Sequence, residues 1–131
     1  MQAIKEAVES YFVDLKNGCN NLISCDQLTE IMGKKDIYIL DIRKPEDFEE
    51  SHLEGAVNFF WSEVGDHLEE IPKDKKVIVY CYSGQSAGQV VSLLRILGYD
   101  ACSLKGGMKC DLTYLPLEAG CCEKEAGACD T

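Results

Sequence analysis

The sequence predicts an α/β fold in which helices cover both faces of a central, mostly parallel sheet of about five strands. Three observations carry this prediction. Helix-like and strand-like segments alternate along the chain, the strand-like segments are short continuous apolar runs of the kind buried in parallel sheets, and the length of 131 residues suits one domain. No internal repeat or interdomain linker interrupts the pattern.

The individual elements follow from local residue patterns. Apolar residues recur at helical spacing over residues 3–16, 25–32 and 85–97. Ser24 precedes the second of these helices and Gln27 follows three residues later, a capping-box pattern. Shorter helices are predicted over residues 45–51 and about 62–70. Apolar, β-branched runs predict strands at 36–42, 56–60, 76–81 and 101–104.

Composition and charge limit the partners of this chain. A net charge of −10 repels nucleic acid and acidic membrane surfaces at long range, so neither is expected as a partner. No stretch approaches the length of a membrane span, and the first residues lack the apolar core of a signal peptide. The sequence therefore predicts a cytoplasmic protein.

Cys81 ends the most strand-like run and precedes a short loop of small and polar residues, Tyr82-Ser83-Gly84-Gln85-Ser86, from which a helix begins. Such a loop can turn successive backbone N–H groups inward, and Gly84 is free to take a positive φ. Together with the helix N-terminus, these groups would stabilise a thiolate or a bound anion without a metal. The serine hydroxyls can add donors. The alternative is that Cys81 simply fills a gap in the core.

Several sequence blocks, taken in order, resemble the rhodanese homology domain, a family of single-domain sulfurtransferases. They are Asp41-Ile42-Arg43, the segment HLEGAVN at 52–58, the strand and loop VIVYCYSGQSA at 77–87, and LKGGM at 104–108. The resemblance divides the chain into an N-terminal helical extension (1–21), a rhodanese-like domain (22–118) and a mobile cysteine-containing tail (119–131).

The resemblance implies a sulfurtransferase or persulfide carrier. Cys81 would accept a sulfane sulfur from a small donor, thiosulfate or a persulfide, and pass it to a thiol acceptor, which can be a protein. No cofactor or metal is implied, and Asp41 and Arg43 would be structural residues near the site. The loop residues expected to bind the anionic substrate are Tyr82, Ser83, Gly84, Gln85, Ser86 and Ala87.

One departure from the family pattern affects the choice of donor. Ser86 stands where family loops commonly carry arginine, so thiosulfate should bind less well than a less charged persulfide. The missing arginine also argues against the phosphatases that share this fold. It leaves open a second interpretation, a catalytically weak binding or regulatory module.

The C-terminal cysteines suggest further possibilities. Cys121, Cys122 and Cys129 could relay sulfur from Cys81. Alternatively, one of them could pair with Cys81 in a thiol redox protein. No Cys-x-x-Cys spacing supports a metal site in this segment.

Overall fold

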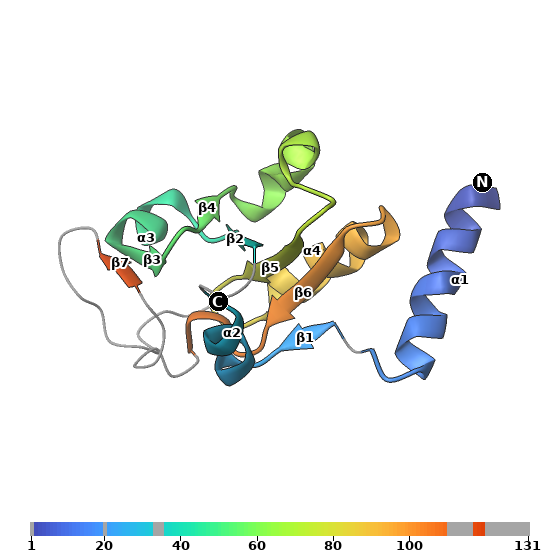
Figure 1. The fold of residues 1–131 in the computed structure, drawn as a ribbon. Coiled ribbons are helices and arrows are strands. Elements are labelled where there is room, and N and C mark those ends of the chain that lie inside the picture. Colours follow the sequence, from blue (N-terminus) through green and yellow to red (C-terminus); the bar gives the residue numbers. More distant parts are fainter. Residues whose placement is uncertain (1, 20, 33–35, 110–116, 120–131) are drawn as a thin grey trace.

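A computed structural model describes residues 2–19, 21–32, 36–109 and 117–119. Its centre is a five-stranded, all-parallel sheet in the order β1-β6-β5-β2-β4 (Figure 1), which confirms the predicted fold class. The strands are β1 (Leu22–Ile23), β2 (Ile37–Asp41), β4 (Val57–Asn58), β5 (Lys76–Tyr80) and β6 (Asp100–Leu104).

The middle strand, β5, is buried on both faces. Val77 and Val79 belong to one apolar cluster, whereas Ile78 and Tyr80 belong to another on the opposite face. Successive side chains of a strand point to opposite faces, so a continuous apolar run is the pattern that two covered faces require. The residue that follows β5 therefore emerges at the carboxyl edge of the most enclosed strand.

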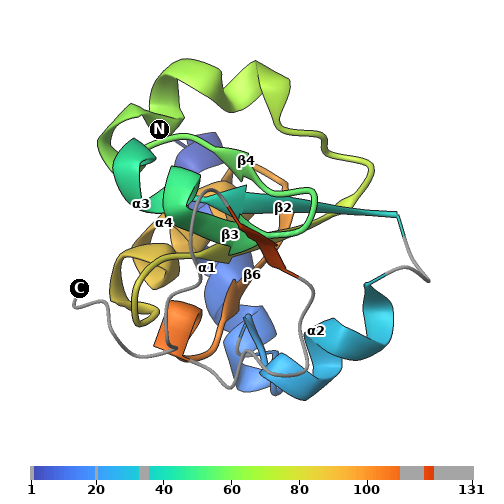
Figure 2. The same cartoon turned by 90° about the vertical axis from the view of Figure 1, so that its left-hand side faces the viewer.

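Different helices cover the two faces (Figures 1 and 2). The helix α4 (Gln85–Ile96) and the 3-10 segment η1 (Trp61–Glu70) pack on the face of Val77 and Val79. The helix α2 (Cys25–Ile31) packs on the other face through Leu28, beside Leu53. The predicted capping box begins α2, since Ser24 and Gln27 exchange hydrogen bonds of 2.9 and 3.1 Å.

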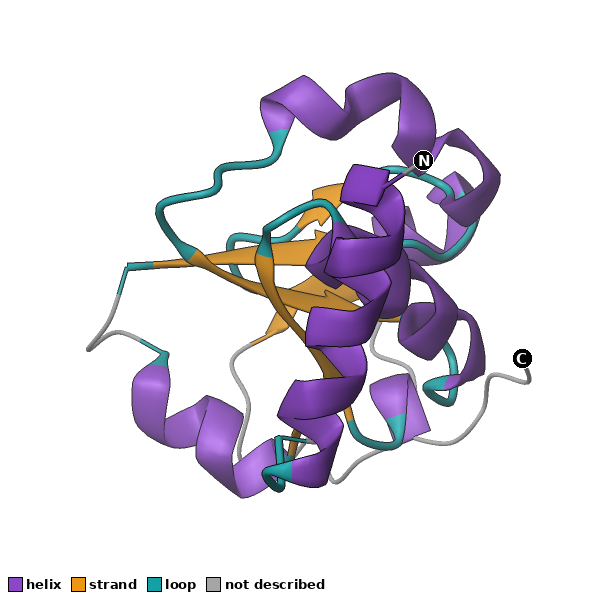
Figure 3. Cartoon of the chain, turned by 90° about the vertical axis from the view of Figure 1, so that its right-hand side faces the viewer, coloured by secondary structure: helices purple, strands orange, loops and turns teal. Residues whose placement is uncertain are grey.

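The N-terminal helix α1 (Gln2–Lys16) lies against the outside of α4 (Figure 3). The Tyr11 and Ser92 hydroxyls join the two helices at 2.9 Å. None of the residues of α1 is buried. This helix is thus added to the outside of the layered domain rather than built into its core. In the described part of the chain, no helix combines the length and apolar character needed to cross a bilayer.

Four features differ from the sequence-based expectation. The sequence did not indicate the short strand β1, which pairs with β6 at one edge of the sheet. The helix predicted over about 62–70 is a run of 3-10 turns over residues 61–70, and this run kinks at His67 because the φ of His67 (−120°) is not helical. After α3 (Pro45–Glu50), the chain continues into β3 (Ser51–Leu53), which pairs antiparallel with β7 (Leu117–Ala119). The sequence indicated neither β3 nor β7, which form a separate two-stranded sheet.

Candidate active site

Cys81 lies directly after β5, at the carboxyl edge of the parallel sheet. This edge is where open α/β sheets bind their ligands. The side chain is only 2% exposed and belongs to the apolar cluster that includes Ala87 and Val90 of α4. The thiol therefore sits under the N-terminal end of α4, largely shielded from water.

The sulfur of Cys81 faces backbone amides. The N–H groups of Gly84 and Ala87 donate to Sγ at 3.1 and 3.4 Å. Gly84 takes a left-handed conformation, with φ at +108°, and is the N-cap of α4. The side chain of an N-cap residue normally accepts the N–H of the third helical residue, which is Ala87 here, but Gly84 has no side chain to do so. The sulfur of Cys81 takes that place, which favours a negative charge on it.

The remaining predicted loop residues, Tyr82, Ser83, Gln85 and Ser86, are all described by the structure and do not donate to the sulfur of Cys81. Within the described chain, the hydrogen bonds to Sγ come from amides rather than from the hydroxyls of Ser83 and Ser86. Gln85 is exposed, whereas Ser86 is half-buried in the first turn of α4. The contacts to the sulfur come from backbone amides, as the loop pattern indicated, and the structure does not bring the additional serine donors to the thiol.

A second backbone segment supports the loop from behind. The N–H of Met108 donates to the carbonyl of Cys81 at 3.0 Å. Gly107, with φ at +53°, approaches so closely that a Cβ there would lie 2.4 Å from the same carbonyl oxygen and 2.9 Å from the nitrogen of Ser83. The Gly106-Gly107 turn therefore permits a backbone contact that a side chain would prevent.

The predicted structural pair, Asp41 and Arg43, is buried beside the site. Their side chains are 0% and 1% exposed, and Nη2 of Arg43 lies 2.7 Å from Oδ2 of Asp41. The same guanidinium donates to the carbonyl of Ser51 at 2.7 Å, and Asn58 donates to the carbonyls of Asp41 and Arg43. Because its hydrogen bonds are this numerous, the buried charge pair is held rigidly in place.

The structure adds a contact that the sequence did not indicate. The hydroxyl of Tyr82 donates to Asp47 in the first turn of α3 and accepts the N–H of Lys44 at 3.3 Å. Burial and the hydrogen bond to Asp47 raise the pKa of Tyr82 to about 12. On the strand side of Cys81, burial and the charge of Asp41 also raise the pKa of Tyr80.

The tail cysteines Cys121, Cys122 and Cys129 lie outside the described residues, so their suggested roles remain predictions. Among the described cysteines, Cys19, Cys81 and Cys102 are free, whereas Cys25 is disulfide-bonded. No cluster of three or more potential metal ligands occurs within the described ranges.

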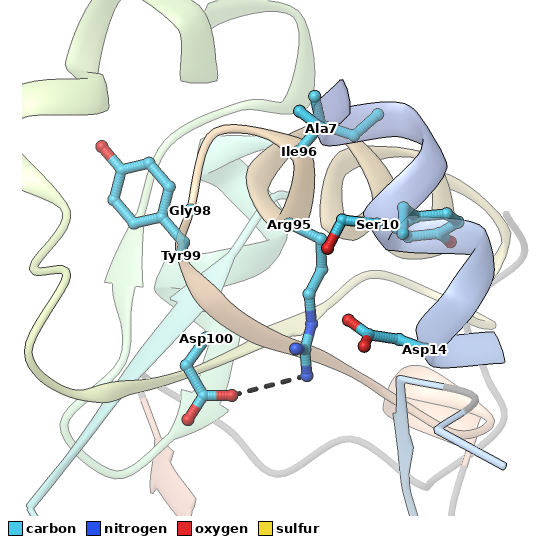
Figure 4. Close-up of a pocket in the computed structure, with 9 residues that line it drawn as sticks. Ala7, Ser10, Asp14, Arg95, Ile96, Gly98, Tyr99 and Asp100 are labelled. Atoms are coloured by element: carbon cyan, nitrogen blue, oxygen red, sulfur yellow. Dashed lines mark hydrogen bonds and ion pairs between the residues drawn. The ribbon is translucent and has the colours of Figure 1, made fainter. Parts of the chain in front are cut away.

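A separate hollow of about 410 Å³ lies between α1 and the end of α4 (Figure 4). Asp14, Arg95 and Asp100 line it, and Arg95 is paired with Asp100 at 3.4 Å. None of the residues of the Cys81 loop contributes to its wall. The hollow is therefore distinct from the site at the carboxyl edge of the sheet.

Comparison with known proteins identifies the family of this chain. A family model described as the rhodanese-like domain matches residues 24–110. The chain belongs to the rhodanese-like domain family. This match includes the Asp41–Arg43 pair, the Cys81 loop and the Gly106-Gly107 turn of the rhodanese-like domain.

Curated relatives and solved structures support the assignment. The thiosulfate sulfurtransferase GlpE of Coxiella burnetii is 35% identical over 81 residues, covering 61% of this chain and 76% of the relative. The thiosulfate sulfurtransferase PspE of Escherichia coli is 35% identical over 72 residues, covering 53% and 69%. A rhodanese-like domain protein from Staphylococcus aureus superposes with a TM-score of 0.64 at 26% identity, covering 67% of this chain and 87% of that one.

Proposed function

We propose that this rhodanese-like protein is a sulfurtransferase whose nucleophile is the thiolate of Cys81. The observation that carries the proposal is the pair of amides, from Gly84 and Ala87, directed at Sγ at the start of α4. The names of the curated relatives, thiosulfate sulfurtransferases, support the same reaction class.

The reaction has two thiolate-exchange steps. In the first, the Cys81 thiolate attacks the outer sulfur of the donor. An S–S bond forms on Cys81, and the donor's S–S bond breaks with its electron pair leaving on sulfite (from thiosulfate) or on a thiolate (from a persulfide). In the second, an acceptor thiolate attacks the outer sulfur of the Cys81 persulfide. The acceptor leaves as a persulfide, and Cys81 returns as a thiolate.

The site favours this chemistry for electrostatic reasons. The attacking thiolate and the persulfide are both anionic, so the same inward amides can stabilise the resting enzyme and the intermediate. The loop supplies no arginine, since Ser86 occupies the position in question. We therefore propose that a persulfide is a better donor than thiosulfate, which carries two negative charges.

Steady-state turnover tests this function. Purified protein is assayed with thiosulfate and, separately, with a low-molecular-weight persulfide, using a thiol acceptor in both cases. Cys81→Ser should abolish turnover with both donors. Cys19→Ser is the matched control because Cys19 is an exposed, free thiol away from the loop, and this variant should keep full activity. Equal turnover by Cys81→Ser and wild type would refute the proposal.

Cytoplasmic location and sulfur relay by Cys121, Cys122 and Cys129 also remain proposals. Fractionation of cells tests the first. Replacing the three tail cysteines together with serine tests the second, because a relay predicts slower delivery to the acceptor with unchanged loading of Cys81.

A further inference from the structure

The two residues that flank Cys81 in the chain both contact one buried guanidinium. The ζ carbon of Arg43 lies 5.5 Å from the ring centroid of Tyr80 and 5.9 Å from that of Tyr82. Tyr80 belongs to the apolar cluster on the α2 face, whereas Cys81 belongs to the cluster on the α4 face. Tyr80 and its contact with Arg43 thus lie on the side of β5 away from the thiol.

The guanidinium is a rigid support for both rings. Arg43 is 1% exposed, and its Nε and Nη2 atoms donate to Asp41 at 2.7–3.1 Å. The Nη2 atom also donates to the carbonyl of Ser51, just after α3. A planar guanidinium held by several bonds in a dry environment has little freedom to move.

The hydroxyls of both tyrosines are tied to the α3–β3 segment. Tyr80 accepts the N–H of Leu53 at 3.1 Å. Tyr82 donates to the carboxylate of Asp47 and accepts the N–H of Lys44 at 3.3 Å. The hydroxyl of Tyr82 is protonated and can donate at neutral pH, since burial and Asp47 raise its pKa further, to about 12. The backbone on each side of Cys81 is therefore anchored to residues 44–53.

We infer that Tyr82 is a positioning residue: its hydroxyl, held by Asp47 and by the N–H of Lys44, fixes the loop so that the Gly84 and Ala87 amides converge on the Cys81 sulfur. Tyr82 is the first residue after Cys81, and Gly84 follows two residues later. A shift at Tyr82 therefore propagates directly to the Gly84 amide. This inference rests on the proposed function, because it concerns the reactivity of the same thiol.

Two substitutions distinguish the hydrogen bond between Tyr82 and Asp47 from the negative charge of Asp47. Tyr82→Phe removes the hydroxyl but keeps a ring over Arg43. Asp47→Asn removes the negative charge but keeps an oxygen that can accept the Tyr82 hydrogen. If the hydrogen bond between Tyr82 and Asp47 positions the loop, Tyr82→Phe should change the reactivity of the Cys81 thiol strongly and Asp47→Asn should change it only slightly. Asp47→Ala removes the acceptor, so it should resemble Tyr82→Phe.

The primary readout is the pH profile of Cys81 alkylation by iodoacetamide, followed by peptide mass spectrometry. In Tyr82→Phe, the midpoint of this profile should rise by about half a pH unit or more, because the amides no longer converge on the thiolate. With a persulfide donor, kcat should fall about ten-fold while KM stays within two-fold of wild type. Asp47→Asn should change the midpoint and kcat by much less than Tyr82→Phe does, because its amide oxygen can still accept the Tyr82 hydrogen.

A double substitution tests whether the two side chains act together. Tyr82→Phe with Asp47→Ala should shift the midpoint no further than either change alone, since both break the same hydrogen bond. Circular dichroism confirms that each variant is folded at the assay temperature.

A folded Tyr82→Phe protein with the wild-type midpoint and kcat would overturn the inference, even if it melted at a lower temperature. Failure of the proposed function gives a different result. If wild-type Cys81 never forms a persulfide but Tyr82→Phe still raises the alkylation midpoint, the sulfurtransferase assignment fails and the positioning role stands.

Discussion

Replacing Gly107 with alanine tests the backbone support beneath the Cys81 loop. An L residue at φ of +53° costs about 1–2 kcal/mol of conformational strain. The added Cβ would lie 2.4 Å from the Cys81 carbonyl oxygen, and real Cβ contacts are essentially never shorter than 3.0 Å. The two segments must therefore separate, which weakens the 3.0 Å hydrogen bond from Met108 and adds about 1 kcal/mol.

These contributions sum to a loss of about 2–3 kcal/mol in the free energy of unfolding. Urea denaturation measures it as a fall in midpoint at constant slope. Gly55→Ala is the matched control, because Gly55 also has a positive φ (+81°) but a Cβ there would meet nothing within 4 Å. We expect Gly55→Ala to lose only the conformational strain. Equal losses in the two variants would show that the close approach at Gly107 contributes nothing.

Three further predictions concern the surroundings of the loop. Asp41→Ala leaves the Arg43 charge buried without its partner, so the free energy of unfolding in urea should fall by about 3–5 kcal/mol; a loss below about 1 kcal/mol would contradict the structural role of the pair. Ser86→Arg places a cation in the first turn of α4, and KM for thiosulfate should fall about ten-fold, the effect of one charge-assisted hydrogen bond; an unchanged KM would show that arginine is not what limits thiosulfate binding. Folding raises the pKa of Tyr82 from 10.0 to about 12, so the stability gained from its protonated hydroxyl is complete below pH 10 and is lost as the pH rises through 12. Denaturation at pH 10 and 12 should therefore show a larger loss for wild type than for Tyr82→Phe, and parallel losses would exclude this contribution.

The parts of the fold that local patterns specify were predictable from the sequence. The Ser24–Gln27 capping box depends on two side chains three residues apart, and the apolar run before Cys81 identifies a strand buried on both faces. The position of Cys81 at the strand end followed from the same run. These features need no knowledge of how distant segments pack.

The contacts between segments that are distant in the sequence could not be predicted, because they depend on tertiary packing. Tyr82 and Asp47 are 35 residues apart and meet only because α3 packs beside the loop. The Gly106-Gly107 turn was visible in the sequence, but its approach to the Cys81 carbonyl was not. The pairing of β3 with β7 was equally hidden, since each strand has only three residues. The loop pattern indicated amide donors to the sulfur, but it did not show which amides converge on Sγ or that the serine hydroxyls do not join them.

The most direct test of the account is the intact mass of the protein after incubation with a persulfide donor. Wild type should gain the mass of one sulfur atom, peptide mapping should place it on Cys81, and an added thiol should remove it. The Cys81→Ser protein should gain nothing on that peptide. A stable wild-type mass, or sulfur carried equally by the Cys81→Ser protein, would contradict the claim that amides at the start of α4 hold a reactive sulfur.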